Sequence, residues 1–242
     1  MLFLRSSLLH LFMAITTVLV SVCSLVLMPF PYFIRYSIIN AYANANVWLM
    51  KYLNGIKYVV EGSENIPDFP VILFPKHQST WETFALQVIF HRISFVFKKE
   101  LFYIPFFGWG LAAMKPVAIK RGSGKIAVKA LVTNGKKRLS ENISVVVFPE
   151  GTRTHTTGPG KYRIGGAVLA AESGVPVLPI AHNAGECWPR KSWILYPGKI
   201  TVRIGPLIET AGKQPDQILS EAKLWIEQQM PEISANYHAE NT

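Results

Sequence analysis

The chain has 242 residues, which is enough for one domain with a sizeable hydrophobic core. Lysine and arginine number 25 against 15 aspartate and glutamate residues, giving a formal charge of +10. An excess of this kind suits a partner that carries phosphate groups, whether a lipid headgroup, a phosphorylated substrate or nucleic acid. Two cysteines, Cys23 and Cys187, are too few for a disulfide framework, so a disulfide-rich secreted module is excluded.

The first 53 residues differ in composition from the rest of the chain. No charged side chain occurs from residue 11 to residue 33, and in hydrocarbon only a helix could satisfy the backbone of such a segment. Pro29 and Pro31 interrupt the run, so this helix is predicted to end near Met28. Its length of about 27 Å is marginal for a hydrocarbon core of about 30 Å.

A second, amphipathic helix is predicted from residue 35 to residue 51. We therefore expect a membrane-embedded helical hairpin over residues 1–53, which either spans the bilayer or stays in one leaflet, and a single domain over residues 54–242. The alternative is a cleaved signal peptide, but the length of the apolar run and its two prolines disfavour it. Basic residues after the run favour a cytoplasmic position for the domain, at a bacterial-type inner membrane.

Beyond the hairpin, short β-rich runs alternate with helical stretches. The predicted strands are 56–62, 71–75, 93–98, 117–121, 144–151, 175–183 and 199–205. The predicted helices are 80–91, 124–139, 164–173 and 215–230. This alternation is typical of an α/β fold with a mostly parallel central sheet, here of about seven strands, covered by helices on both faces. Active sites in such sheets lie beyond the carboxyl ends of the strands.

A histidine and a glutamate follow the second predicted strand. His77 falls in the loop after the strand, and Glu82 falls in the first turn of the helix that Ser79 or Thr80 can cap. A carboxylate that accepts a hydrogen bond from one imidazole nitrogen leaves the other nitrogen free to act as a general base. No Gly-x-Ser-x-Gly elbow occurs, so the activated hydroxyl would belong to a substrate. The alternative is a helix-capping carboxylate beside an incidental surface histidine.

The stretch FPEGTR at residues 148–153 is a candidate phosphate site. Gly151 permits close approach to the backbone, Arg153 offers bidentate contacts to a phosphate, and Glu150 can orient that guanidinium or a substrate hydroxyl. A second cationic pair, Lys120 and Arg121, ends the predicted strand 117–121. The predicted substrate-binding residues are Lys120, Arg121, Glu150, Gly151, Thr152 and Arg153.

The aromatic stretch from Lys99 to Pro116 has two interpretations. One is ordinary core packing, and the other is an acyl-chain groove or membrane-contacting surface rimmed by Lys98 and Lys99. The residues predicted to line that groove or surface are Phe102, Phe106, Phe107 and Trp109. The chain's histidines show no ligand spacing, so no metal site is predicted.

Taken together, these motifs resemble those of the membrane-bound glycerolipid acyltransferase family. Four ordered blocks correspond, from about Gly55 to Gly205. They are His77 to Glu82 for His-x4-Asp, residues 117–121 for an arginine-containing strand end, residues 148–153 for Phe-Pro-Glu-Gly-Thr-Arg, and residues 175–179 for Val-Pro-x-x-Pro. The family usually has aspartate where this chain has Glu82. Because the carboxylate is retained and FPEGTR is intact, we interpret the chain as an active variant, with an inactive relative as the alternative.

The resemblance implies an acyltransferase that makes phosphatidic acid. His77 would deprotonate the sn-2 hydroxyl of lysophosphatidic acid (1-acyl-sn-glycerol 3-phosphate) for attack on the thioester of acyl-CoA or acyl-carrier protein, while Glu82 aligns the histidine. It implies no acyl-enzyme and no cofactor. The residues implied to bind the glycerol 3-phosphate part are Arg121, Glu150, Gly151 and Arg153.

Three alternatives to this acceptor and activity remain at the level of the sequence. The acceptor could be glycerol 3-phosphate or another lysophospholipid, because the chemistry would be the same. The chain could also be a catalytically silent, membrane-anchored relative that binds phospholipids. A nucleic-acid module is disfavoured, since it would be soluble, which the apolar N-terminal run contradicts. The expected partners are therefore lysophosphatidic acid, the acyl donor and a lipid bilayer, with no nucleic acid.

Overall fold

A computed structural model describes residues 1–120 and 122–238 of the chain. The α-helices are α1 (Leu2–Val26), α2 (Tyr32–Asn54), α3 (Trp81–Ile89), α4 (Phe107–Ala113), α5 (Lys125–Ser140), α6 (Gly165–Ser173), α7 (Ala184–Cys187) and α8 (Pro215–Ile233). Short 3-10 helices are η1 (Ser63–Asn65) and η2 (Lys99–Tyr103). The strands are β1 (Ile56–Glu61), β2 (Ile72–Pro75), β3 (Ile93–Lys98), β4 (Val117–Ile119), β5 (Ser144–Val146), β6 (Val177–His182) and β7 (Gly198–Ile204).

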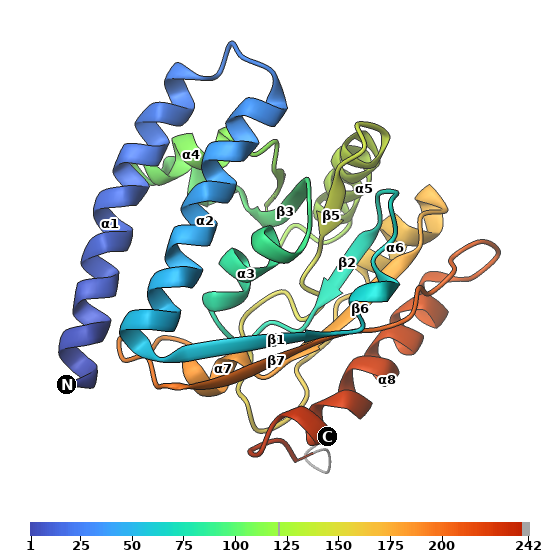
Figure 1. Cartoon of the computed structure of the whole chain (residues 1–242). Coiled ribbons are helices and arrows are strands. Elements are labelled where there is room, and N and C mark those ends of the chain that lie inside the picture. Colours follow the sequence, from blue (N-terminus) through green and yellow to red (C-terminus); the bar gives the residue numbers. More distant parts are fainter. Residues whose placement is uncertain (121, 239–242) are drawn as a thin grey trace.

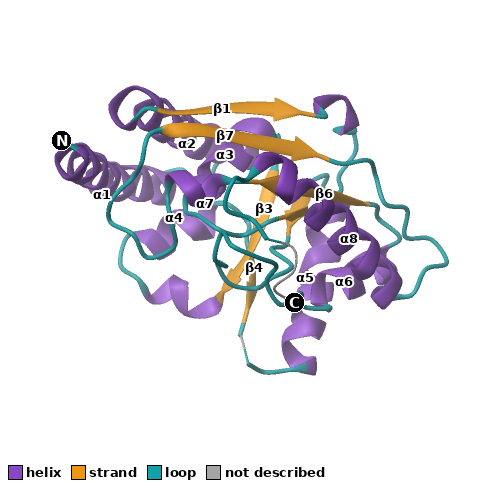
Figure 2. Ribbon diagram, turned by 90° about the horizontal axis from the view of Figure 1, so that it is seen from below, coloured by secondary structure: helices purple, strands orange, loops and turns teal. Residues whose placement is uncertain are grey.

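The strands form a seven-stranded sheet in the order β1-β7-β6-β2-β5-β3-β4. The five strands from β6 to β4 run parallel to one another. Strand β7 is antiparallel to β6 and pairs in parallel with β1, and these two reversed strands lie together at one edge of the sheet (Figure 2). The predicted α/β class with a mostly parallel sheet is therefore confirmed.

Helices cover both faces of the sheet. Successive residues of a strand point to opposite faces. Leu73 of β2 lies in an apolar core shared with α2 and α3, whereas its neighbours Ile72 and Phe74 lie in a second core shared with α5, α6 and α8. All three side chains are fully buried. Burial of one such side chain contributes about 1.5–3 kcal/mol, so the two cores fix the position of β2 and of the loop that follows it.

The N-terminal helices form a hairpin that stands beside the sheet (Figure 1). Helix α1 begins at Leu2 rather than at residue 11 and ends at Val26, close to the predicted end. Pro31 immediately precedes α2, where its missing N–H costs no helical hydrogen bond. Gly55 ends α2 with a φ of 73°, in the left-handed region that glycine adopts without strain, and the chain enters β1 directly. The placement of this hairpin in a membrane stays a prediction.

One face of α1 is apolar and exposed. Its residues recur every three or four positions, which places them on one side of the helix. We call this face the α1 stripe, and it consists of Leu4, Leu8, Leu11, Ile15, Leu19, Val22 and Val26. The opposite side of α1 packs on α2 and α4. Within residues 1–120 and 122–238, α1 is the helix that is long and apolar enough to cross a membrane.

The aromatic stretch holds two helical segments that the sequence did not predict, η2 and α4. Glycine lowers helix propensity, which made a helix from 107 to 113 appear unfavourable. In the structure a Cβ at Gly108 would clash with the backbone of Phe102, and one at Gly110 would lie 2.9 Å from the hydroxyl oxygen of Ser21. The glycines therefore let α4 approach η2 and α1 closely, and this gain in packing outweighs their low propensity.

Candidate active site

His77 and Glu82 meet at the carboxyl end of β2. The Nδ1 atom of His77 lies 2.7 Å from Oε1 of Glu82. Because the ionised carboxylate only accepts hydrogen bonds, Nδ1 carries the proton and Nε2 is left as an acceptor. The Nε2 atom is thereby set up as a base toward any hydroxyl group that approaches it.

Glu82 also shapes the loop that carries His77. Its carboxylate oxygens accept the backbone N–H of Gln78 at 3.0 Å and of Ser79 at 2.8 and 3.0 Å. Burial alone would raise the pKa of Glu82, but the imidazoles of His182 and His77 and the N–H of Ser79 together hold it below its usual value. Glu82 is therefore ionised at neutral pH, and it accepts hydrogen bonds both from the backbone before α3 and from the ring of His77.

The FPEGTR loop holds His77 from the other side. Phe148 stacks on the imidazole, with ring centroids 3.9 Å apart and planes 20° apart. Glu150 Oε2 accepts the backbone N–H of His77 at 2.7 Å, and the N–H of Thr154 donates to the carbonyl of His77 at 2.7 Å. The ring plane, the N–H and the C=O of His77 are thus each fixed by residues 148–154.

His182 ends β6 and lies behind the same loop. Its Nε2 donates to the carbonyl of Lys76 at 2.7 Å, and its Nδ1 accepts the N–H of Ala184 at 3.2 Å. Burial lowers the pKa of His182, which agrees with a neutral ring that makes both bonds. His182 is thus a buried structural histidine. No cluster of three metal-ligating side chains occurs in the described part of the chain.

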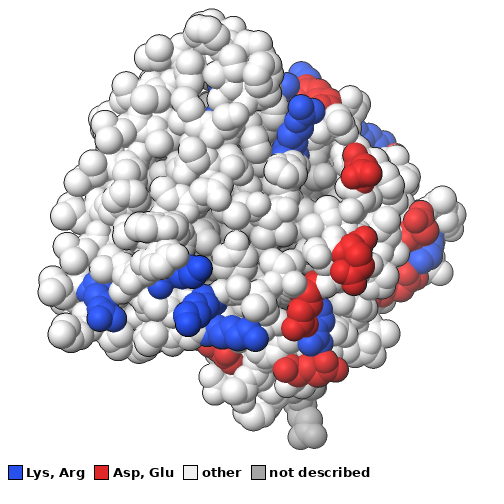
Figure 3. Space-filling view, viewed as in Figure 1, with Lys and Arg blue, Asp and Glu red and all other residues white. Residues whose placement is uncertain are grey.

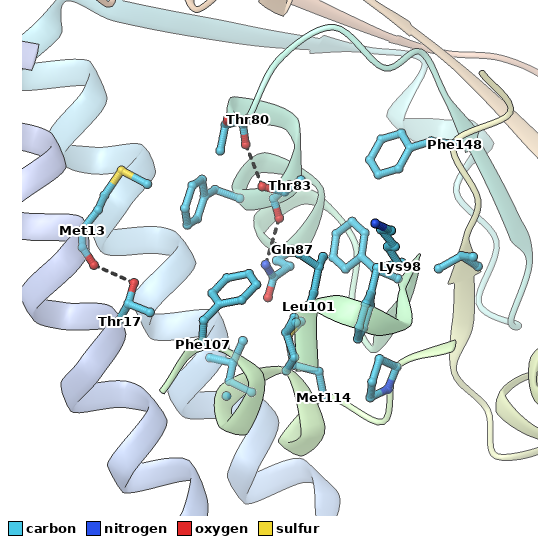
Figure 4. Close-up of a pocket in the computed structure, with 18 of the residues that line it drawn as sticks. Met13, Thr17, Thr80, Thr83, Gln87, Lys98, Leu101, Phe107, Met114 and Phe148 are labelled. Atoms are coloured by element: carbon cyan, nitrogen blue, oxygen red, sulfur yellow. Dashed lines mark hydrogen bonds between the residues drawn. The ribbon is translucent and has the colours of Figure 1, made fainter. Parts of the chain in front are cut away.

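A cavity of about 600 Å³ opens beside His77. Its walls come from the hairpin, α3, β3, η2 and α4, and Figure 4 shows Met13 and Thr17 of α1 facing Phe107 of α4 across it. Most of the lining is apolar. The apolar side chains include Met13, Val20, Ile39, Phe84, Phe95, Phe97, Leu101, Phe107, Leu111, Met114 and Phe148. The charged side chains that line it are Lys98, Arg153, Arg190 and Lys191.

Some of the predicted site residues line this cavity and others do not. His77, Thr152, Arg153 and Phe107 are lining residues. Glu82 is buried behind His77, and Glu150 is buried with both oxygens bonded to protein groups. The predicted residues that fall outside the cavity lining are Lys120, Gly151, Phe102, Phe106 and Trp109. Arg121 lies outside the described residues.

The aromatic residues outside the cavity lining take two positions. Phe102 packs on Phe97, with ring centroids 5.2 Å apart. Phe106 and Trp109 contact each other and are 38% and 39% exposed, on the surface next to α1. The exposed pair therefore fits the predicted membrane-contacting surface better than the predicted groove.

Three cationic lining residues were missed or placed only at the rim by sequence reasoning. Lys98 ends β3, whose carboxyl end lies at the same sheet edge as those of β2 and β5, so topology could have assigned it to the site. Arg190 and Lys191 lie in the irregular segment after α7. No motif marks them, and only the fold brings them to the cavity.

The chain is similar to known acyltransferases. The family model described as Acyltransferase matches residues 57–183. A 1-acyl-sn-glycerol-3-phosphate acyltransferase of Pseudomonas aeruginosa is 45% identical over 208 residues, which is 84% of this chain and 81% of the relative. A yeast enzyme of the same name, from Saccharomyces cerevisiae, is 31% identical over 175 residues, which is 70% of this chain and 57% of the relative.

A solved structure shares the whole architecture. The crystal structure of the 1-acyl-sn-glycerophosphate acyltransferase PlsC from Thermotoga maritima superimposes with a TM-score of 0.77 over 96% of this chain and 97% of that chain. The two sequences are 23% identical, so this likeness concerns the fold. The match to the family model and the 45% identity to a relative show that this chain belongs to the acyltransferase family.

Proposed function

We propose that this chain transfers a fatty acyl group from an acyl thioester to the sn-2 hydroxyl of 1-acyl-sn-glycerol 3-phosphate, giving phosphatidic acid. The observation that carries the proposal is the His77–Glu82 pair, with His77 lining a cavity whose wall is mostly apolar and also carries four cationic side chains. An acceptor with one acyl chain, one free hydroxyl and one phosphate matches these three features. The name of the Pseudomonas aeruginosa relative supports the same acceptor.

The proposed reaction is a direct transfer. His77 Nε2 takes the proton of the sn-2 hydroxyl as its oxygen attacks the thioester carbonyl carbon. The C–S bond then breaks, and the imidazolium returns the proton to the sulfur of the leaving thiolate. Glu82 stabilises the imidazolium between these steps through its 2.7 Å contact with Nδ1. The thioester of CoA or of acyl-carrier protein is already activated, so the proposed steps need no metal and no cofactor.

We propose that two cations that line the cavity hold the acceptor phosphate. Arg153 is the last residue of the FPEGTR stretch, and Lys98 is the last residue of β3. Both side chains line the cavity. Guanidinium and ammonium groups bind phosphate oxygens through charge-assisted hydrogen bonds. A phosphate held there would leave the acyl chain to the apolar wall and the glycerol hydroxyl to His77.

The hairpin provides a route from a membrane to this cavity. The α1 stripe is exposed and apolar, and the opposite side of the hairpin forms a cavity wall. The start of α1 and the end of α2 lie at the same end of the hairpin (Figure 1). Lys and Arg side chains gather at this end, below an uncharged surface (Figure 3). Basic side chains favour the anionic headgroup region. We therefore place the hairpin in one leaflet, and the domain on the cytoplasmic side of a bacterial-type inner membrane.

Replacing His77 by alanine tests the general base. The variant is expected to lower kcat about 1,000-fold, because it removes the group that takes the hydroxyl proton. Phosphatidic acid is measured with lysophosphatidic acid and a long-chain acyl-CoA, and parallel reactions use glycerol 3-phosphate and other lysophospholipids. Equal activity of native and variant protein would reject the mechanism, and faster acylation of another acceptor would reject the proposed substrate.

Replacing Glu82 tests the histidine–carboxylate pair. Glu82→Gln is expected to lower kcat about 100-fold, since an amide cannot stabilise the imidazolium as a carboxylate does and its NH2 would face the N–H of Ser79. Glu82→Asp keeps the charge and is expected to retain more activity than the glutamine variant. If both variants turned over as fast as the native chain, Glu82 would have only its structural role at the helix end.

Replacing Lys98 tests the phosphate site, and Lys99 supplies a matched control because it is exposed and does not line the cavity. Loss of one charge-assisted hydrogen bond of about 1.5 kcal/mol predicts a KM for lysophosphatidic acid about tenfold higher in Lys98→Met. Lys99→Met is expected to keep the native KM. A similar KM for all three proteins would exclude Lys98 from phosphate binding.

Charges on the α1 stripe test the membrane contact. Each aspartate in hydrocarbon costs about 2.5–3.5 kcal/mol, so Leu11→Asp combined with Ile15→Asp is expected to release the chain from phospholipid vesicles in a flotation assay. Ile126→Asp is the control, because Ile126 is 73% exposed but lies on α5. Flotation of the double variant with the vesicles to the same extent as the control would refute this contact.

A further inference from the structure

Lys76 is a fully buried lysine directly before the proposed base. Its side chain is 0% exposed, and its Nζ lies 3.0 Å from Oε1 of Glu150 and 2.8 Å from Oε1 of Glu227. A buried ammonium group is costly unless it is paired and hydrogen-bonded. The two carboxylates meet that need, and neither Lys76 nor Glu227 lines the cavity.

Glu227 reaches Lys76 from α8, far away in the sequence. Its Oε1 accepts the hydroxyl of Tyr162 at 2.7 Å, and its Oε2 accepts the hydroxyl of Tyr237. The ring of Tyr237 lies 5.3 Å from the ammonium nitrogen of Lys76, and the ring of Tyr162 lies 6.0 Å from it. The two aromatic rings flank the ammonium group and exclude water from it, which strengthens its attraction to both carboxylates.

Glu150 joins this buried cluster to the proposed base. One of its oxygens faces Lys76, and the other accepts the backbone N–H of His77 at 2.7 Å. Thr154 adds a hydrogen bond to the oxygen that faces Lys76, at 3.2 Å. A continuous series of polar contacts therefore runs from Glu227 through Lys76 and Glu150 to the backbone of His77.

We propose that Lys76 and Glu227 are positioning residues for acyl transfer. They hold the carboxylate of Glu150 fixed in place, so that it sets the position of His77 relative to Glu82 and the cavity. The assignment rests on the proposed function. Catalytic groups need placement within about 0.5 Å, and a shift of about 1 Å can cost about 100-fold in rate.

A purely stabilising role explains the cluster less well. Buried ion pairs are often no more stable than apolar side chains of the same volume, so stability alone gives little reason for two fully buried charges and a third that is partly buried. Here the charges stand directly behind one residue of the proposed catalytic pair. Among them, Glu150 binds the backbone of His77 and not its ring, which fixes the location of His77 while leaving Nε2 free.

The test compares the full-length native chain with Lys76→Met, Glu227→Gln and Glu232→Gln. Methionine fills the space of the lysine without its charge. Glutamine keeps the shape of Glu227, and the hydroxyl of Tyr237 can turn to accept from its NH2. Glu232 is the matched control, since it lies on the same helix, pairs with Arg203 and is largely exposed. For each protein, kcat and KM for lysophosphatidic acid are measured, and thermal unfolding verifies folding.

The expected result is a loss confined to kcat. Lys76→Met should lower kcat about 100-fold and Glu227→Gln about tenfold, with KM within about twofold of native, because substrate contacts are unchanged. Glu232→Gln should match the native chain. Combining Lys76→Met with Glu150→Gln should be no slower than the slower single variant, because both interrupt one series of contacts.

Two results overturn the assignment on different grounds. If folded Glu227→Gln keeps the native kcat, the cluster does not position His77, and this result stands even where Lys76→Met fails to fold. The same conclusion follows if the losses of kcat in Lys76→Met and Glu150→Gln multiply in the double variant. If the native chain makes no phosphatidic acid, the proposed function itself is wrong and the assignment falls with it. Native activity therefore separates the two failures.

Discussion

Two buried carboxylates hold the loop between β2 and α3, and the geometry of the whole site depends on them. Glu82 accepts three hydrogen-bond donors from one side of this loop, and Glu150 accepts the N–H of His77 from the other. Both carboxylates are buried, so each requires hydrogen-bond donors or cations close by. The loop supplies the donors, and the need to satisfy buried charge thereby fixes the position of the imidazole.

The sheet topology decides which side chains can surround that loop. Strands β2, β5 and β3 are neighbours and parallel, so their carboxyl ends deliver His77, the FPEGTR loop and Lys98 to one edge. The reversed pair β7 and β1 lies at a lateral edge of the sheet, beside the hairpin, and contributes no residue to the cavity lining. Strand direction therefore decides which strands carry the candidate site.

Sequence patterns captured those parts of the molecule that local physics determines. Short β-rich runs gave all seven strands, and the signal is clearest for β2 and β6, because a strand buried on both faces must be apolar throughout. The spacing of His77 and Glu82 gave their contact, because a loop and the first turn of the next helix are always adjacent. The helix at Phe107 was missed, since the packing of its glycines against Phe102 and Ser21 depends on the tertiary structure.

Long-range charge pairing was the other feature that the sequence did not show. Lys76 and Glu227 come from opposite ends of the domain, and no motif links them. A lysine after an apolar strand normally indicates a solvated loop, and only α8 packing across the sheet makes it a buried ion. The cations Arg190 and Lys191 were missed for the same reason, because the irregular segment that carries them has no pattern of its own.

The hairpin also changes the meaning of the boundary predicted at residue 54. Met13, Thr17 and Val20 of α1 and Ile39 and Tyr42 of α2 form one wall of the cavity. The segment predicted to anchor the chain thus lines the cavity that we propose to hold the substrate. A chain whose hairpin has not docked lacks that wall. Under the proposed function and membrane contact, the completion of the acyl-binding cavity and the arrival at a lipid surface would be one event. Catalytic competence would then be acquired only where the substrate already is.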